Sequence, residues 1–351
     1  MSNVISIGLP RRPNLSQRQA LLLRNFALHR RDSSDVFWLK ENAELLNVLA
    51  TSGARLQPEA LEVYRPFYDS IAGRLAFFPQ YYRFLLSVCL DLEDLGMQGD
   101  AGAGVCHRVR ARGLVDAELS DLQRAEAERL LARRGEGSGD TALAARLRRF
   151  ISCSDTFALP NKKAAYELTH IVFYLSEYGR NDPCLTEEAV TSLEFAGVLA
   201  WLDQDFDLLS EVCVALRFAG RTPSDIWEDW LALETGRFSL RSAAQGSGAP
   251  DAYHEYLVGS WWAAHAGAEG FHGTPVEGAL TVERLGSSRG PLRRISEYMF
   301  HLGPARSCDW DQMRGLLEAV LGEDDHRILS CAAESTTRFG DFFEGFARAD
   351  A

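Results

Sequence analysis

Hydrophobic residues recur along most of the chain at the three- and four-residue spacing of amphipathic helices. Many apolar segments end on glycine, as at Leu95-Gly96, Ala219-Gly220 and Ala266-Gly267, where a helix can turn left-handed without a Cβ clash. Alternating β-branched residues occur only in fragments such as Thr281–Leu285. The predicted helices cover residues 16–31, 35–51, 57–73, 79–95, 101–112, 116–134, 140–152, 161–178, 187–202, 207–219, 223–234, 252–266, 291–301, 310–321 and 325–347.

This pattern predicts an all-α fold. Short connections favour antiparallel neighbours, so we expect layered antiparallel helical hairpins in an α/α stack or a toroid-like arrangement. The segment Ser239–Pro250 is rich in Ser, Gly and Ala and is predicted to be an exposed linker. We therefore divide the chain into a basic N-terminal arm (1–14), a main helical domain (15–240) and a C-terminal helical part (251–351) that packs on the main body.

Composition limits the location of the protein. None of the apolar runs among the 351 residues approaches the roughly 18 residues that a membrane span requires. The seven cysteines are scattered and show no C-x-x-C spacing, which is typical of free thiols in a reducing compartment. We expect a cytoplasmic protein without a membrane span.

Charge is distributed unevenly along the chain. The net charge is −12, yet the first 31 residues contain no acid, so they carry +6 and the remainder carries −18. An acidic body disfavours nucleic acid as a partner. The basic arm could dock to an acidic protein surface, or it could fold back on its own acidic body. Its arginines are Arg11, Arg12, Arg18, Arg24, Arg30 and Arg31.

The segment 166–179 is the strongest candidate for a site. At helical spacing one stripe of this segment is polar and aromatic, although the helix is apolar almost all round and is therefore expected to be buried. A buried ionisable group requires a partner. We predict His170, Glu167 and Glu177 as catalytic residues and Tyr166 and Tyr174 as substrate-binding residues.

A second acidic group is expected to complete this site. Asp91 and Asp94 lie near the C-terminus of a predicted helix, where carboxylates oppose the helix dipole. Basic partners such as Arg83 or Lys162 would explain this placement without a function. The functional hypothesis is that Asp91 and Asp94 bind substrate and face His170 across a shared cavity.

Two patterns resemble metal sites. Glu167-x-x-His170 matches the ligand pair of di-metal helical bundles, but the only second match, Glu269-x-x-His272, falls in an irregular segment. The more plain interpretation is a core histidine bonded to a tyrosine hydroxyl or a backbone carbonyl. We accordingly assign no metal ligand and no cofactor.

The acids Asp203, Asp207 and Glu211 would share one face of a continuous helix. Aspartate is, however, a poor residue for a helix interior and a good N-cap. We therefore favour a turn in which Asp207 caps a new helix and these acids are mostly solvated.

The chain resembles a family of all-helical proteins without an assigned function from marine and soil alphaproteobacteria. The resemblance rests on Phe157–Lys163 leading into Tyr166–Gly179, and on Asp121–Glu126. It implies a full-length match to a cytoplasmic helical domain, and it supplies no activity, substrate or catalytic residue.

Two functional hypotheses follow. The first is a non-catalytic interaction or accessory protein that docks to another protein through the basic arm, because no complete catalytic motif is present. The second is a small-molecule enzyme or binding protein with a central polar and aromatic cavity, with dependence on a metal as one option. The first hypothesis is preferred on the sequence alone.

Overall fold

The computed structural model describes residues 13–243, 251–286 and 289–349, and these are predominantly helical. The predicted all-α class is confirmed. The described strands, β1 (Phe238–Ser242) and β2 (Leu280–Arg284), form one antiparallel pair in which Phe238 lies opposite Arg284. Strand β1 takes up the first residues of the predicted linker, and residues 244–250 of that linker lie outside the described ranges. No helix in the described ranges is long and apolar enough to span a membrane.

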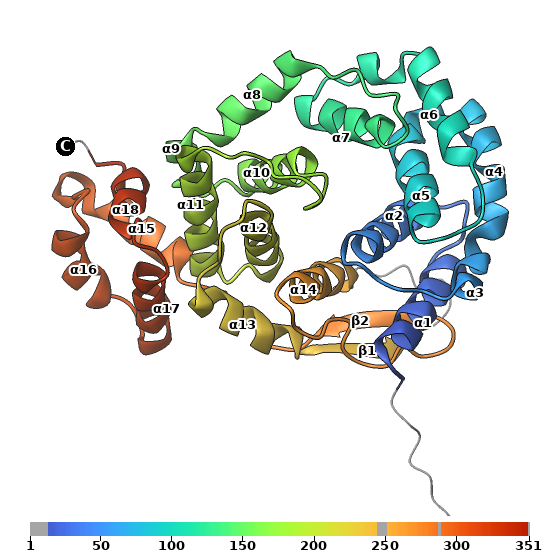
Figure 1. Ribbon diagram of the computed structural model, residues 1–351. Helices are drawn as coiled ribbons and strands as arrows, with labels where there is room; N and C mark the ends of the chain where they lie inside the picture. The colour runs from blue at the N-terminus through green and yellow to red at the C-terminus, as the bar shows by residue number, and fades with distance from the viewer. Residues whose placement is uncertain (1–12, 244–250, 287–288, 350–351) are drawn as a thin grey trace, which may run out of the picture.

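An inner layer of helices forms a closed ring (Figure 1). Each inner helix packs against the next in chain order, and the last, α14, packs back against the first, α2. The toroid-like form of the prediction describes this arrangement. The inner helices are α2 (Val36–Thr51), α5 (Tyr82–Asp94), α7 (Asp121–Ala132), α10 (Lys162–Leu175), α12 (Phe206–Phe218) and α14 (Tyr253–His265).

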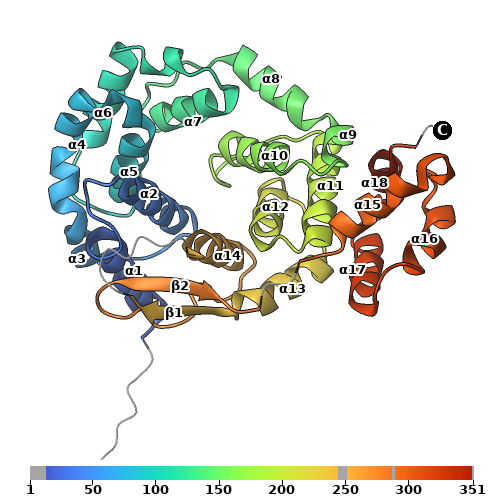
Figure 2. The same ribbon diagram turned by 180° about the vertical axis from the view of Figure 1, so that it is seen from behind.

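An outer layer surrounds the ring on most sides, as both views show (Figures 1 and 2). The strand pair completes it between α13 and α1. The outer helices are α1 (Leu15–Leu28), α3 (Pro58–Leu61), α4 (Arg65–Phe77), α6 (Ala101–Ala111), α8 (Thr141–Ile151), α9 (Ser154–Phe157), α11 (Glu187–Asp203) and α13 (Asp225–Thr235). Short 3-10 helices are η1 (Glu62–Tyr64), η2 (Pro79–Tyr81), η3 (Leu114–Ala117) and η4 (Gly303–Ala305).

The C-terminal helices lie outside the ring and pack against α11 through α15 and α17 (Figure 2). They are α15 (Leu292–Leu302), α16 (Trp310–Glu318), α17 (Glu323–Glu334) and α18 (Phe339–Ala347). The sequence predicted α17 and α18 as one helix. They are separate because the Thr336 hydroxyl accepts from the Arg338 amide and competes with helical bonding.

A buried ion-pair network closes the ring between its first and last elements. Arg30 binds Glu41 of α2 at 2.9 Å and Asp251, just before α14, at 2.8 Å. All three side chains are at most 7% exposed. Buried charges are tolerated only when they are paired in this way. The network therefore fixes the start of α14 against the start of the chain.

Candidate metal centre

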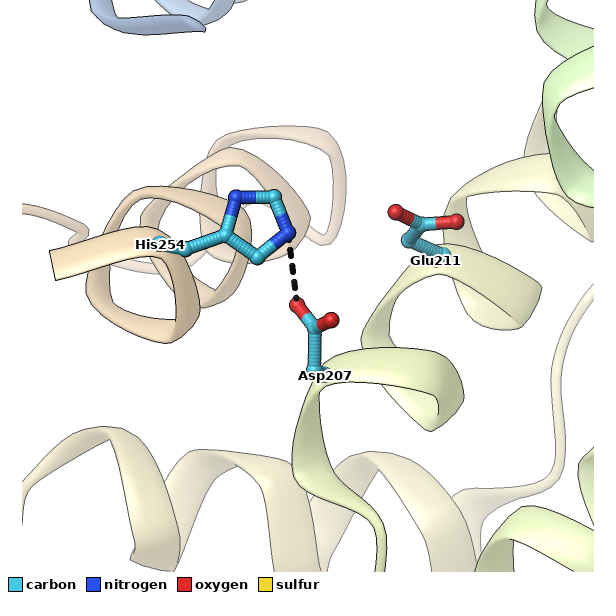
Figure 3. A group of neighbouring side chains, drawn as sticks. All are labelled: Asp207, Glu211 and His254. Carbon is cyan, nitrogen blue, oxygen red and sulfur yellow. Dashed lines mark ion pairs between the residues drawn. The ribbon is translucent and has the colours of Figure 1, made fainter. Parts of the chain in front are cut away.

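Three side chains from two inner helices converge on the inner face of the ring (Figure 3). Asp207 and Glu211 come from α12 and His254 comes from α14. One ligand atom of each lies within 4.8 Å of those of the other two. The closest recorded approach is 3.4 Å, between His254 Nε2 and Asp207 Oδ1.

The local sequence explains how α12 presents its two carboxylates. Gln204 adopts a left-handed conformation and ends α11, and the Asp205 side chain caps α12 by accepting from the Leu208 amide. Asp207 and Glu211 then lie one turn apart on the same helix face. The predicted turn exists, but Asp205 and not Asp207 is the cap. The acids at 207 and 211 are also not solvated, since their side chains are 13% and 5% exposed.

A glycine allows α14 to approach α12 closely. A Cβ on Gly259 would lie 2.5 Å from Cζ of Phe206, the residue that precedes Asp207. The start of α14 is held by Asp251, which accepts from the amides of Tyr253 and Val282. Together these contacts place His254 opposite the carboxylates of α12.

Neighbouring residues hold the second polar atom of each side chain. Tyr166 donates to Asp207 Oδ2 at 2.7 Å, and Thr169 donates to Glu211 Oε2 at 2.6 Å. His254 Nδ1 lies 3.3 Å from Glu44 Oε2. Asp207 Oδ1 is buried and makes no hydrogen bond within the described ranges, and its contact there is the 3.4 Å ion pair with His254 Nε2. Such outer partners orient metal ligands in proteins and set the histidine tautomer.

The electrostatics of the group are those of a site short of positive charge. Burial lowers the pKa of His254, but Asp207 and Glu44 outweigh it and raise the pKa to about 11. Burial raises the pKa of Glu211. Burial also acts to raise the pKa of Asp207, but His254 and Tyr166 lower it overall. Asp207 and Glu44 both flank His254, while the buried Glu211 carboxylate has no arginine or lysine partner among the described residues. A bound cation would supply the positive charge that Glu211 lacks.

His170 lies beside this group on α10. Its Nδ1 is 2.8 Å from the Tyr166 carbonyl oxygen and 3.6 Å from Glu211 Oε2. Donation from Nδ1 to the carbonyl leaves Nε2 unprotonated in the neutral ring. The backbone bond agrees with the plain interpretation of a core histidine. The side chain is nevertheless 34% exposed, so His170 is also accessible from solvent.

The predicted site residues do not form one group. His170 and Tyr166 adjoin Asp207 and Glu211, whereas Glu167 forms an ion pair with Lys163. The others lie at α7: Glu177 binds Arg129, and the Arg129 guanidinium lies over the ring of Tyr174.

Asp91 and Asp94 belong to the α7 side as well. Both bind Arg133, at 2.8 and 2.9 Å. Arg180 also contacts Asp94. Their partners are thus arginines, although not Arg83 or the lysine that the sequence suggested.

Sequence reasoning missed part of the group. The four-residue spacing of Asp207 and Glu211 was the available signal, and it was interpreted as a solvated turn. His254 and Glu44 carried no local signal, because they lie on helices remote in the sequence. The second Glu-x-x-His pair does not take part, since its Glu269 binds Arg18 and is not in the group around Asp207.

The donor set of two carboxylates and one imidazole is chemically specific. Mixed oxygen and nitrogen ligands suit Zn²⁺, Mn²⁺ and Fe²⁺ better than Ca²⁺, which prefers six to eight oxygens. Three protein ligands are the number that catalytic metal sites use, because positions must remain for water or substrate. The residues present therefore fit a divalent cation with positions left for water or another ligand.

Comparison with known proteins gives the family of the chain. A family model described as a domain of unknown function (DUF6902) matches residues 1–349, so the chain belongs to this family. This agrees with the full-length family resemblance drawn from the sequence. No curated protein and no solved structure matches the chain.

Proposed function

We propose that this protein is a divalent-metal-dependent enzyme that acts on a small molecule at the inner face of its helical ring. Asp207, Glu211 and His254 are the proposed ligands. The observation that carries the proposal is that one ligand atom of each of these three side chains lies within 4.8 Å of those of the other two, while a neighbour contacts a polar atom of each.

The roles of the residues follow from their contacts. A divalent cation bound here would supply Lewis acidity toward water or a substrate oxygen. Tyr166, Thr169 and Glu44 orient the ligands. In the neutral form of His170, Nδ1 donates to the Tyr166 carbonyl and Nε2 can accept a proton from a reacting group. Its partial exposure gives a substrate access to it.

The interaction hypothesis has less support among the described residues. Arg18, Arg30 and Arg31 are bound to Glu269, Asp251 and Glu41. Arg11, Arg12 and most of the predicted arm lie outside the described residues. Part of the N-terminal positive charge therefore neutralises the body of the protein, which leaves less of it for a partner.

The test is metal binding by chelator-treated protein. Mn²⁺ and Zn²⁺ are titrated by calorimetry into the wild type, His254→Ala and His170→Ala, and elemental mass spectrometry measures the metal content of the protein as isolated. We expect one ion per chain, its loss in His254→Ala, and retention in His170→Ala.

Two results would contradict the proposal. One is the absence of binding to folded wild-type protein at millimolar Mn²⁺ and Zn²⁺. The other is unchanged binding in His254→Ala. In either case His254 would be a structural imidazolium between Asp207 and Glu44.

A further inference from the structure

A cavity separate from the metal centre opens between α7, α8 and α10. Its volume is about 560 Å³, within the range that small ligands occupy. Leu143, Leu147 and Leu175 form an apolar part of its lining, and Arg129 and Tyr174 form a polar part. The cavity therefore offers two kinds of surface to a single ligand.

Arg129 is held rigidly but uses little of its hydrogen-bonding capacity. Its side chain is 7% exposed, and its guanidinium carbon lies 4.7 Å from the centre of the Tyr178 ring and 5.6 Å from that of Tyr174. Its single hydrogen bond within the described ranges runs from Nη1 to Glu177. A guanidinium has five N–H donors, and burial without partners is costly.

The backbone that positions these groups around Arg129 is conformationally strained. Glu177 and Tyr178 both adopt positive φ angles, 46° and 54°, which are unfavourable for residues with a Cβ. This turn brings the Glu177 carboxylate and the Tyr178 ring to Arg129. Arg133, one turn further along, differs: its two Nη atoms bind Asp91 and Asp94.

The acids that line the cavity are already engaged. Glu177 also has Arg180 at 3.7 Å, Glu128 binds Arg110 at 2.7 Å, and Asp140 caps α8. A further anion would therefore meet the free donors of Arg129 and not a repelling carboxylate without a partner. Guanidinium binds carboxylates through paired N–H bonds.

We propose that this cavity binds a small organic monocarboxylate, with the carboxylate on Arg129 and the apolar tail on Leu143, Leu147 and Leu175. This site is separate from the proposed metal centre. Tyr174 links the two, because its ring contacts both Arg129 and His170.

The experiment titrates acetate, butyrate, hexanoate and inorganic phosphate into the full-length protein, followed by calorimetry and by NMR of the amides around Tyr174. The variants are Arg129→Gln, Arg129→Lys and, as a matched control, Arg134→Gln. Arg134 lies on the same segment but binds Glu93 and does not line the cavity. Circular dichroism checks the folding of each variant.

We expect affinity to rise about threefold to fourfold for each added CH₂ group, as apolar burial predicts. Arg129→Gln should weaken hexanoate binding at least tenfold, Arg129→Lys should weaken it less, and Arg134→Gln should leave it unchanged. If Arg129→Gln unfolds, Arg129→Lys and the NMR shifts still decide the matter.

The proposal is overturned if hexanoate does not bind at 10 mM, if chain length has no effect, or if phosphate binds more tightly than hexanoate. Repeating the titration in Asp207→Asn separates the two proposals. Hexanoate binding should survive in that variant whether or not a metal site exists.

Discussion

Two sides of the inner ring both contain several carboxylates, but the basic groups that bind these carboxylates differ. On the α5–α7 side, Asp91 and Asp94 share Arg133, and Glu177 binds Arg129. On the α12–α14 side, the carboxylates of Asp207, Glu211 and Glu44 lie around His254, and their other basic neighbours are His170 beside Glu211 and the half-exposed Lys40 beside Glu44. In the first arrangement every carboxylate has an arginine partner. In the second, the positive charge on His254 depends on a proton, which a metal ion would replace under the proposed function.

This difference shows that burial of acids does not by itself mark a functional site. A carboxylate beside a permanent guanidinium is stabilised as part of the fold. A carboxylate beside a histidine can be neutralised in two ways, because the imidazole can bind either a proton or a metal ion. Changes on the two sides should accordingly have opposite consequences for stability and for binding.

The largest expected effect is the loss of folding stability in Arg133→Gln. It leaves Asp91, whose side chain is 2% exposed, without its cation, and breaking a buried pair costs about 3–5 kcal/mol. Glu211→Gln in chelator-treated protein should cost less than about 1 kcal/mol, because it removes one of several like charges. Urea unfolding measures both, and equal losses would show that the two sides do not differ in this way.

The next effect is on metal affinity. Asp207→Asn should weaken Mn²⁺ or Zn²⁺ binding by at least about 100-fold, since a ligand matters more than its outer partners. Asp94→Asn is the matched control and should change affinity less than about twofold. Calorimetry gives both values, and comparable losses in the two variants would place the cation elsewhere.

Outer partners should contribute less. Glu44→Gln and Tyr166→Phe are each expected to weaken metal binding by about tenfold, because they orient His254 and Asp207 without touching the ion. The fold should be unaffected in both variants. Unchanged affinity in both would mean that these contacts only support packing.

The smallest effect concerns acid stability on the α7 side. Burial raises the pKa of Asp94, but Arg133 and Arg180 lower it below 3.8 overall. The ion pairs therefore contribute stability above pH 3.8 that is lost as pH falls through the lower folded-state pKa. At 26% exposure the contribution should be about 0.2–1 kcal/mol.

The test compares urea unfolding of wild type and Asp94→Asn between pH 2.5 and 7. The wild type should be more stable near neutral pH, and the difference should vanish at the acid end. A difference that is constant with pH would show that the carboxylate charge is not its source.

Much of the helical architecture was predictable because its signals are local. Periodicity gave the class and most helices, and glycines at 96, 220 and 267 adopt the positive φ expected at helix ends. The end of α10 was predicted at residue 178 and lies at Leu175, because the inward turn of Glu177 and Tyr178 depends on Arg129 of another helix.

The sequence by itself determined the helical class, the placement of Tyr166 and His170 one turn apart on one helix, and the spacing of Asp207 and Glu211. Only the tertiary structure decided which helices are neighbours around the ring. Ring closure brings His254 and Glu44 to α12 and assigns Arg133 to Asp91, over separations of about 40 to 210 residues. Whether a carboxylate is neutralised by an arginine or remains able to bind another cation depends on those partners, and no local sequence pattern encodes them.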